Sequence, residues 1–127
     1  MGVSRTRVVL YGIKGKYSDF ITEDCAEYES AEMKYILPNE YDINANDESA
    51  SKGKFGVFSD GMCGEYSFLC YFLYGNDEGD WGEDCEFSID AKTLSTLADT
   101  FKQDAAKLGI AEEDIQKAKL YSFYWYS

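Results

Sequence analysis

The stretch FGVFSDGMCGEYSFLCYFLY, residues 55–74, predicts a β-hairpin and with it most of the fold. Its two arms, 55–59 and 65–74, are rich in Phe, Tyr and aliphatic residues, which favour strands. Between the arms, Asp60-Gly61 and Gly64 are typical of a turn, because glycine accepts a positive φ without a Cβ clash. Apolar side chains occupy both alternating sets of positions in the second arm. We therefore expect that arm to lie inside a sheet, covered on each face.

Further strands should extend this hairpin into a sheet. Residues 5–13 alternate at period two and carry apolar side chains on both faces, so this segment also reads as an internal strand. Residues 120–125 predict a closing strand rich in Tyr and Phe, and residues 85–89 alternate like a short one.

One long helix is expected over residues 91–108. Asp90 is a natural N-cap, and Gly109 fits the C′ position that ends a helix. The apolar residues between them form one stripe at helical spacing: Leu94, Leu97, Ala98, Phe101, Ala105 and Leu108. A short helix is expected to follow at 111–117.

The segment before the hairpin has an ambiguous pattern of apolar residues. Residues 17–36 fit a broken helical pattern, with Ser18 or Thr22 as alternative N-caps, and Pro38 ends whatever precedes it. Residues 39–53 form a polar loop without periodicity. The chain as a whole, residues 1–127, thus predicts a single α+β domain. It should have a mainly antiparallel sheet of four to five strands, with the long amphipathic helix packed on it.

Composition and charge reduce the range of functions that this chain is expected to have. The chain has 127 residues, 24 acidic and 12 basic, which give a formal net charge of -12, and it has no histidine. Residues 1–16 carry +4, residues 17–90 carry -16, and residues 91–127 are neutral. The acidity therefore belongs to the middle of the chain. It disfavours direct binding to nucleic acid or to anionic lipid, both of which need Lys and Arg.

The sequence carries no recognisable metal or catalytic motif. Without histidine there is no Ser-His-Asp triad, Cys-His pair or imidazole ligand. No Cys-x-x-Cys pair occurs among the four cysteines, so zinc is not expected and free thiols are, with Cys70 as core filler. Asp42-x-Asn44-x-Asn46 matches half a calcium loop, but Asp47 and Gly53 stand where that loop needs Gly and Glu. We therefore expect no metal, no cofactor and no enzymatic activity.

Two groups of residues are candidates for binding. The first is an acidic loop around a tryptophan, which could contact a basic partner: Asp77, Glu78, Asp80, Trp81, Glu83 and Asp84. The second, an alternative, is a cationic cluster around a tyrosine that could hold the phosphates of a small ligand: Arg5, Arg7, Tyr11 and Lys14, with Lys16 close by. The acidity of the middle segment could also be only solubilising.

Two stretches carry a resemblance. The opening Val8-Val9-Leu10-Tyr11-Gly12-Ile13-Lys14 and the later Phe58-Ser59-Asp60-Gly61-Met62-Cys63-Gly64-Glu65-Tyr66 resemble small uncharacterised proteins encoded by bacteriophages. Those proteins pair a Tyr-Gly-Ile-Lys strand with an Asp-Gly-Met-x-Gly-Glu-Tyr hairpin, and end in a helix and an aromatic strand. The resemblance covers about half the chain in pieces. It implies the fold and a phage source, and it carries no catalytic residues.

Together these features predict a phage-encoded inhibitor of a host defence system, such as an anti-CRISPR protein. Its acidic surface would take the place of nucleic acid in a basic groove of a host protein. One alternative is a small-molecule sponge for a nucleotide immune signal, and another is a phage housekeeping protein. No secretory signal or membrane-length apolar run is recognisable, so the host cytoplasm is the expected location. The oligomeric state stays open.

Overall fold

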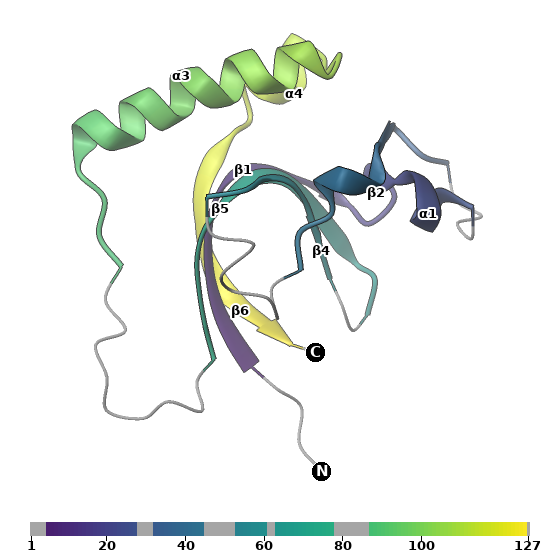
Figure 1. Cartoon of the computed structure of the whole chain (residues 1–127), viewed down its shortest axis with the longest axis horizontal. Coiled ribbons are helices and arrows are strands. Elements are labelled where there is room, and N and C mark those ends of the chain that lie inside the picture. The colour runs from purple at the N-terminus through teal and green to yellow at the C-terminus, as the bar shows by residue number, and fades with distance from the viewer. Residues whose placement is uncertain (1–4, 28–31, 45–52, 61–62, 78–86, 127) are drawn as a thin grey trace.

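The protein is an α+β domain whose long strands are bent into a curled sheet (Figure 1). The computed structural model describes residues 5–27, 32–44, 53–60, 63–77 and 87–126. Its main sheet has four antiparallel strands in the order β4-β5-β1-β6, and a second sheet pairs β2 with β3. The predicted fold class is therefore confirmed.

The two strands predicted to be internal are the centre of the main sheet. β1 (Arg5–Lys16) and β5 (Tyr66–Asp77) pair along their whole length, with one register shift between Val9 and Leu10. β4 (Phe55–Ser59) flanks β5 as the other arm of the predicted hairpin, and β6 (Lys119–Tyr126) flanks β1. Gly64 adopts a φ of 64° in the turn between β4 and β5, which is a conformation that favours glycine.

Each face of the main sheet carries its own apolar core, because alternate residues of β1 and β5 point to opposite sides. On the outer side of the curl, Leu69 and Tyr71 pack with residues of the long helix. On the inner side the core is largely aromatic. Four of its aromatic side chains are fully or nearly buried, and Phe123 is partly buried beside them: Phe58, Phe68, Phe72 and Trp125.

The inner core joins the two edges of the curled sheet. The Phe58 ring of β4 lies 5.5 Å from the Trp125 ring of β6, measured between centroids. The Trp125 Nε1–H also donates a hydrogen bond of 3.1 Å to the carbonyl oxygen of Ser59. One side chain thus bridges strands that are not neighbours in the sheet.

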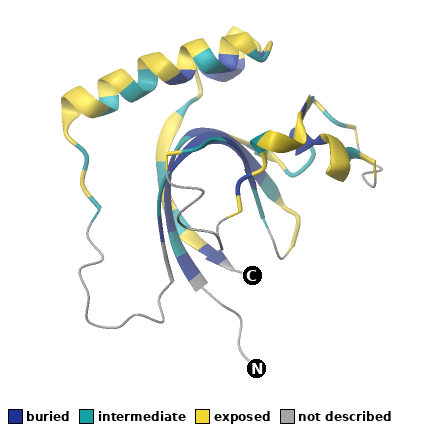
Figure 2. Cartoon of the chain, viewed as in Figure 1, coloured by how far each residue is buried: buried dark blue, intermediate teal, exposed yellow. Residues whose placement is uncertain are grey.

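The long helix, α3 (Ala91–Lys107), forms as predicted and lies across the outside of the curl (Figure 1). The Asp90 carboxylate accepts a 2.7 Å hydrogen bond from the Thr93 N–H, which satisfies one of the free donors of the first turn. Gly109 follows the helix with a φ of 80°. Phe101 and Ala105 are the buried residues of α3, and Figure 2 shows that much of the rest of the helix surface is exposed.

The ambiguous segment before Pro38 is a small parallel unit rather than a helix. β2 (Phe20–Thr22) pairs in parallel with β3 (Tyr35–Leu37), and the four-residue α1 (Glu23–Ala26) follows β2 directly. The helical pattern is therefore wrong for the two strands, but Thr22, one of the two predicted N-caps, does precede the short helix α1. Three-residue strands are too short to show a period of two, and Phe20 and Leu37 are buried because they pack on the outer core.

Two short helical elements follow Pro38 and Gly109. A single 3₁₀ turn, η1 (Asn39–Tyr41), follows Pro38, and α4 (Glu112–Ile115) is the short helix expected after Gly109. The strand predicted over 85–89 does not form in its described part, where residues 87–90 are irregular. The Phe87 ring packs instead 5.9 Å from the Tyr74 ring, so its burial is aromatic contact and not strand pairing.

Candidate functional site

Four exposed carboxylates gather where α1 meets η1. Glu23, Asp24 and Glu27 belong to α1 and its C-cap, and Glu40 belongs to η1. The two elements are tied together by a hydrogen bond of 2.9 Å, donated by the Asp24 backbone N–H to the side-chain oxygen of Asn39. We call these four residues the acidic end. Figures 1 and 2 show α1 as a projecting, exposed element at one side of the curled sheet.

No described residue neutralises the charge of the acidic end. None of its four carboxylates forms an ion pair in the described part of the chain. The two described lysines of the acid-rich middle segment, residues 17–90, are engaged elsewhere. Lys34 binds Asp114 at 2.8 Å, and the Lys54 ammonium donates a 2.6 Å hydrogen bond to the carbonyl oxygen of Asp42.

An exposed apolar residue accompanies these carboxylates. Ile36 is 52 % exposed, although it lies in β3 between half-buried Tyr35 and buried Leu37. It pairs in register with Ile21 of β2, and α1 packs against both strands. The β2–β3 unit and its helix therefore present an exposed apolar side chain as well as exposed negative charges, which is a common composition for a protein-binding surface.

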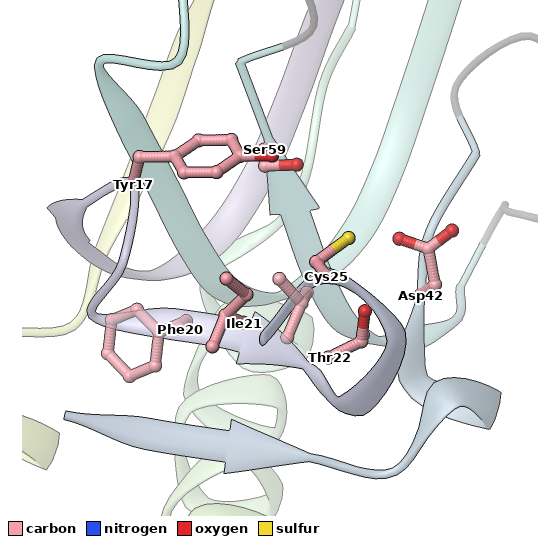
Figure 3. A pocket seen from close by; sticks show the side chains of 8 residues that line it. Tyr17, Phe20, Ile21, Thr22, Cys25, Asp42 and Ser59 are labelled. Carbon is pink, nitrogen blue, oxygen red and sulfur yellow. The ribbon is translucent and has the colours of Figure 1, made fainter. Parts of the chain in front are cut away.

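A small hollow lies beneath α1, but its size rules out a ligand site. Figure 3 shows Cys25 and Asp42 at its rim, with Ile21 and Thr22 beside them. The hollow measures about 10 Å³, which is roughly the space of one water molecule. Loss of water around the Asp42 carboxyl raises its pKa, and nearby Lys54 opposes this effect. This hollow offers no room for a substrate.

The acidic loop predicted from the sequence lies almost wholly outside the described residues. Glu78, Asp80, Trp81, Glu83 and Asp84 fall between the described ranges. Asp77 is the last residue of β5, where it pairs with Thr6 of β1. The loop therefore stays a predicted partner site. The acidic end was part of the same acid-rich middle segment, but nothing in the sequence indicated that α1 and η1 meet.

The alternative cationic cluster is divided between the two faces of the sheet. Arg5, Arg7, Tyr11 and Lys14 all belong to β1, so Arg7 and Tyr11 alternate away from Lys14. Tyr11 packs edge-on against Phe101 on the outer side, with 5.6 Å between ring centroids. Lys14 lies 5.5 Å from the centre of the Tyr66 ring, which belongs to the inner core. The strand therefore does not assemble Tyr11 and Lys14 into one phosphate clamp.

A hollow does open beside Tyr11, but its charges are mixed. It measures about 300 Å³ and is lined at its polar side by Asp99, Lys102 and Gln116. Burial raises the pKa of the Tyr11 phenol, and the negative charge of Asp99 adds to the effect. The described lining of this hollow has one ammonium and one carboxylate, and so lacks the paired cations that would hold a phosphate tightly.

Two other kinds of site are not found within the described ranges. These residues contain no cluster of three His, Cys, Asp or Glu side chains that could hold a metal ion. Among the described helices, none is long and apolar enough to cross a membrane.

The described cysteines, Cys25, Cys63 and Cys70, are free thiols, and Cys70 is fully buried as predicted.

Comparisons of this chain with protein-family models, with curated proteins and with solved structures found no match.

Proposed function

We propose that this protein acts by binding, and that the acidic end is a surface that captures a basic partner. The observation that carries the proposal is the group of four exposed carboxylates, Glu23, Asp24, Glu27 and Glu40, none of which has an ionic partner in the described chain. Leaving like charges together costs stability through self-repulsion, and the same arrangement raises association rates with a positively charged surface.

The partner that fits this surface best is a protein with a basic groove made for nucleic acid. A group of carboxylates can bind the cationic side chains that otherwise hold the phosphates of nucleic acid. Ile36 adds the apolar contact that a purely electrostatic surface lacks. Together with the resemblance to phage-encoded proteins, this supports a role as an inhibitor of a host defence system, with a nucleic-acid-binding host protein as its target.

The test is capture of partners from a nuclease-treated bacterial lysate, with the tagged full chain as bait. Bound protein should be released as salt rises from about 50 to about 500 mM, because salt screens exposed charges. Added double-stranded DNA should release the same protein by competition. Binding that is indifferent to both treatments would refute the proposal.

Two matched variants locate the surface. In the first, the acidic end is neutralised by Glu23→Gln, Asp24→Asn, Glu27→Gln and Glu40→Gln. In the control, four exposed acids elsewhere are neutralised by Glu65→Gln, Asp99→Asn, Glu112→Gln and Glu113→Gln. Both sets change the net charge from -12 to -8. We expect the first set to lose the partner and the control to keep it. Equal loss in both would mean that net charge, and not this surface, drives binding.

A third variant separates the acidic end from the predicted acidic loop. It neutralises the loop acids Asp77, Glu78, Asp80, Glu83 and Asp84. If this variant loses the partner while the acidic-end variant keeps it, the binding surface is the loop and the assignment to α1 and η1 is wrong.

A further inference from the structure

β6 is an edge strand of the main sheet. It pairs with β1, and no other backbone hydrogen bond reaches it from the described residues. The opposite edge, β4, is covered instead. The carbonyl oxygen of Val57 accepts a 2.9 Å hydrogen bond from the Ile43 N–H, and that of Ser59 accepts the Trp125 indole N–H. Within the described residues, the β4 edge of the main sheet is thus covered by other groups, whereas β6 pairs with β1 alone.

The outer edge of β6 also lacks the usual sequence features that discourage pairing. Edge strands in proteins are commonly shortened, bent or charged, because an unpaired row of N–H and C=O groups attracts another strand. β6 spans eight residues, contains no proline, and has Lys119 as its one charged residue. Its outer face exposes Leu120 at 41 % and Tyr124 at 45 %, which are two of the three exposed large hydrophobic residues in the described chain.

We propose that β6 is a dimerisation strand, which pairs antiparallel with β6 of a second copy of this chain. Ser122 lies opposite its own equivalent at the two-fold axis. In this register Leu120 lies opposite Tyr124 of the second copy, and the reverse pair forms on the other side of the axis. Each apolar side chain that is exposed in the monomer then gains an aromatic or aliphatic cross-strand neighbour.

Charge is what favours a second copy as the occupant. Two chains of net charge -12 repel each other, so they can associate only where acidic residues are absent. After Asp114 the sequence contains no acidic residue, and Lys117 and Lys119 are its only charges there. The acidic end lies on the separate β2–β3 unit, which does not belong to the main sheet. A β6–β6 contact therefore brings together segments of two acidic molecules that carry no acidic residue.

The pairing predicts a specific charge-swap result. Ser122 is exposed, so Ser122→Lys and Ser122→Glu should fold normally, as near-ultraviolet circular dichroism of the aromatic core can verify. Each variant alone places like charges directly opposite each other, which weakens pairing. An equimolar mixture places Lys against Glu, and should associate roughly tenfold more tightly than either variant alone. Ser122→Thr is the matched control and should associate like the wild type.

Sedimentation velocity of the wild type from about 5 to about 500 µM measures the association. We expect a reversible dimer that strengthens as salt rises, because salt screens the repulsion between two acidic chains. This dependence is opposite to that of the proposed partner binding, so each proposal can fail without the other. A wild type that stays monomeric over this range would overturn the dimer. Variants that dimerise like the wild type, or a mixture that fails to recover, would overturn the Ser122-centred register.

Discussion

Replacing Asp114 with alanine should lower the free energy of unfolding by about 2 kcal/mol, because its carboxylate connects the β2–β3 unit to the C-terminal part of the chain. Asp114 lies in α4 and is only 5 % exposed. One oxygen accepts a 2.8 Å hydrogen bond from the Tyr35 hydroxyl, which belongs to β3. The same oxygen lies 2.8 Å from the Lys34 ammonium. The Tyr35 hydroxyl in turn accepts a 3.1 Å hydrogen bond from the Ala111 N–H.

The magnitude comes mainly from the Tyr35 hydrogen bond. A hydrogen bond to a charged group contributes about 1.5–3 kcal/mol when the group is buried. The two lysines add little, because the Lys34 and Lys117 side chains are largely exposed and solvent screens such ion pairs. For a domain of this size, a loss of about 2 kcal/mol corresponds to a decrease in Tm of roughly 6–10 °C. Thermal unfolding followed by circular dichroism at pH 7 measures this difference.

The pH dependence has a definite sign. The hydrogen bond with Lys34, and then that with Tyr35, holds the pKa of Asp114 below its usual range, which outweighs the opposing effect of burial. A depressed pKa in the folded state means that the stabilisation is fully present above the unfolded value of about 4. It is lost as the pH falls through the folded pKa. The Tm difference between wild type and Asp114→Ala should therefore be constant from about pH 7 to pH 5 and shrink below about pH 4.

Two further variants isolate the cause. Glu113→Ala removes an exposed carboxylate from the same helix and should change stability by less than about 0.5 kcal/mol. Tyr35→Phe, combined with Asp114→Ala in a double-mutant cycle, should give a coupling energy of about 1 kcal/mol or more. A coupling near zero would show that the carboxylate does not act through Tyr35. A Tm difference that persists unchanged at pH 3 would show that the charge of the carboxylate does not contribute.

Three other variants or measurements test the packing of the main sheet. Gly12→Ala should destabilise the protein by about 3 kcal/mol or more in urea unfolding, since a Cβ at Gly12 would lie 2.1 Å from the carbonyl oxygen of Leu69 in β5. Trp125→Phe should cost about 1–2 kcal/mol in the same assay, because the indole N–H no longer bridges to Ser59 of β4. Burial raises the pKa of the Cys70 thiol, so a thiol reagent at neutral pH should label the exposed cysteines at once and label Cys70 only after unfolding.

Much of the fold could be predicted because its main elements are long enough to show a period. Twelve-residue β1 and β5 place apolar side chains on both faces, and this alone indicates that both strands are internal. The two ends of α3 could be predicted because the residues that cap the helix lie next to it in the sequence. Asp90 caps its own helix, and Gly109 takes the positive φ that ends it, so neither depends on tertiary contacts.

The β2–β3 unit could not be predicted, because its causes lie outside its own sequence. Its strands have three residues each, which is fewer than two periods of alternation. Phe20 is anchored through its backbone N–H, which donates a 3.2 Å hydrogen bond to the Ser67 hydroxyl of β5, 47 residues away. Tyr35 is fixed by Asp114 from α4. Contacts of this range leave no local pattern.

The structure of the same unit explains why the acidic end could not be predicted from the sequence. Parallel pairing of β2 with β3 requires the chain to cross back between them, so α1 projects from the sheet with its acids exposed. The anchors of the unit, Phe20 and Tyr35, contact Ser67 and Asp114 and involve none of the four exposed carboxylates. The acidic end can therefore be neutralised without loss of the contacts that hold it in place. A binding defect in that variant can accordingly be attributed to the surface itself, provided that its Tm matches the wild type.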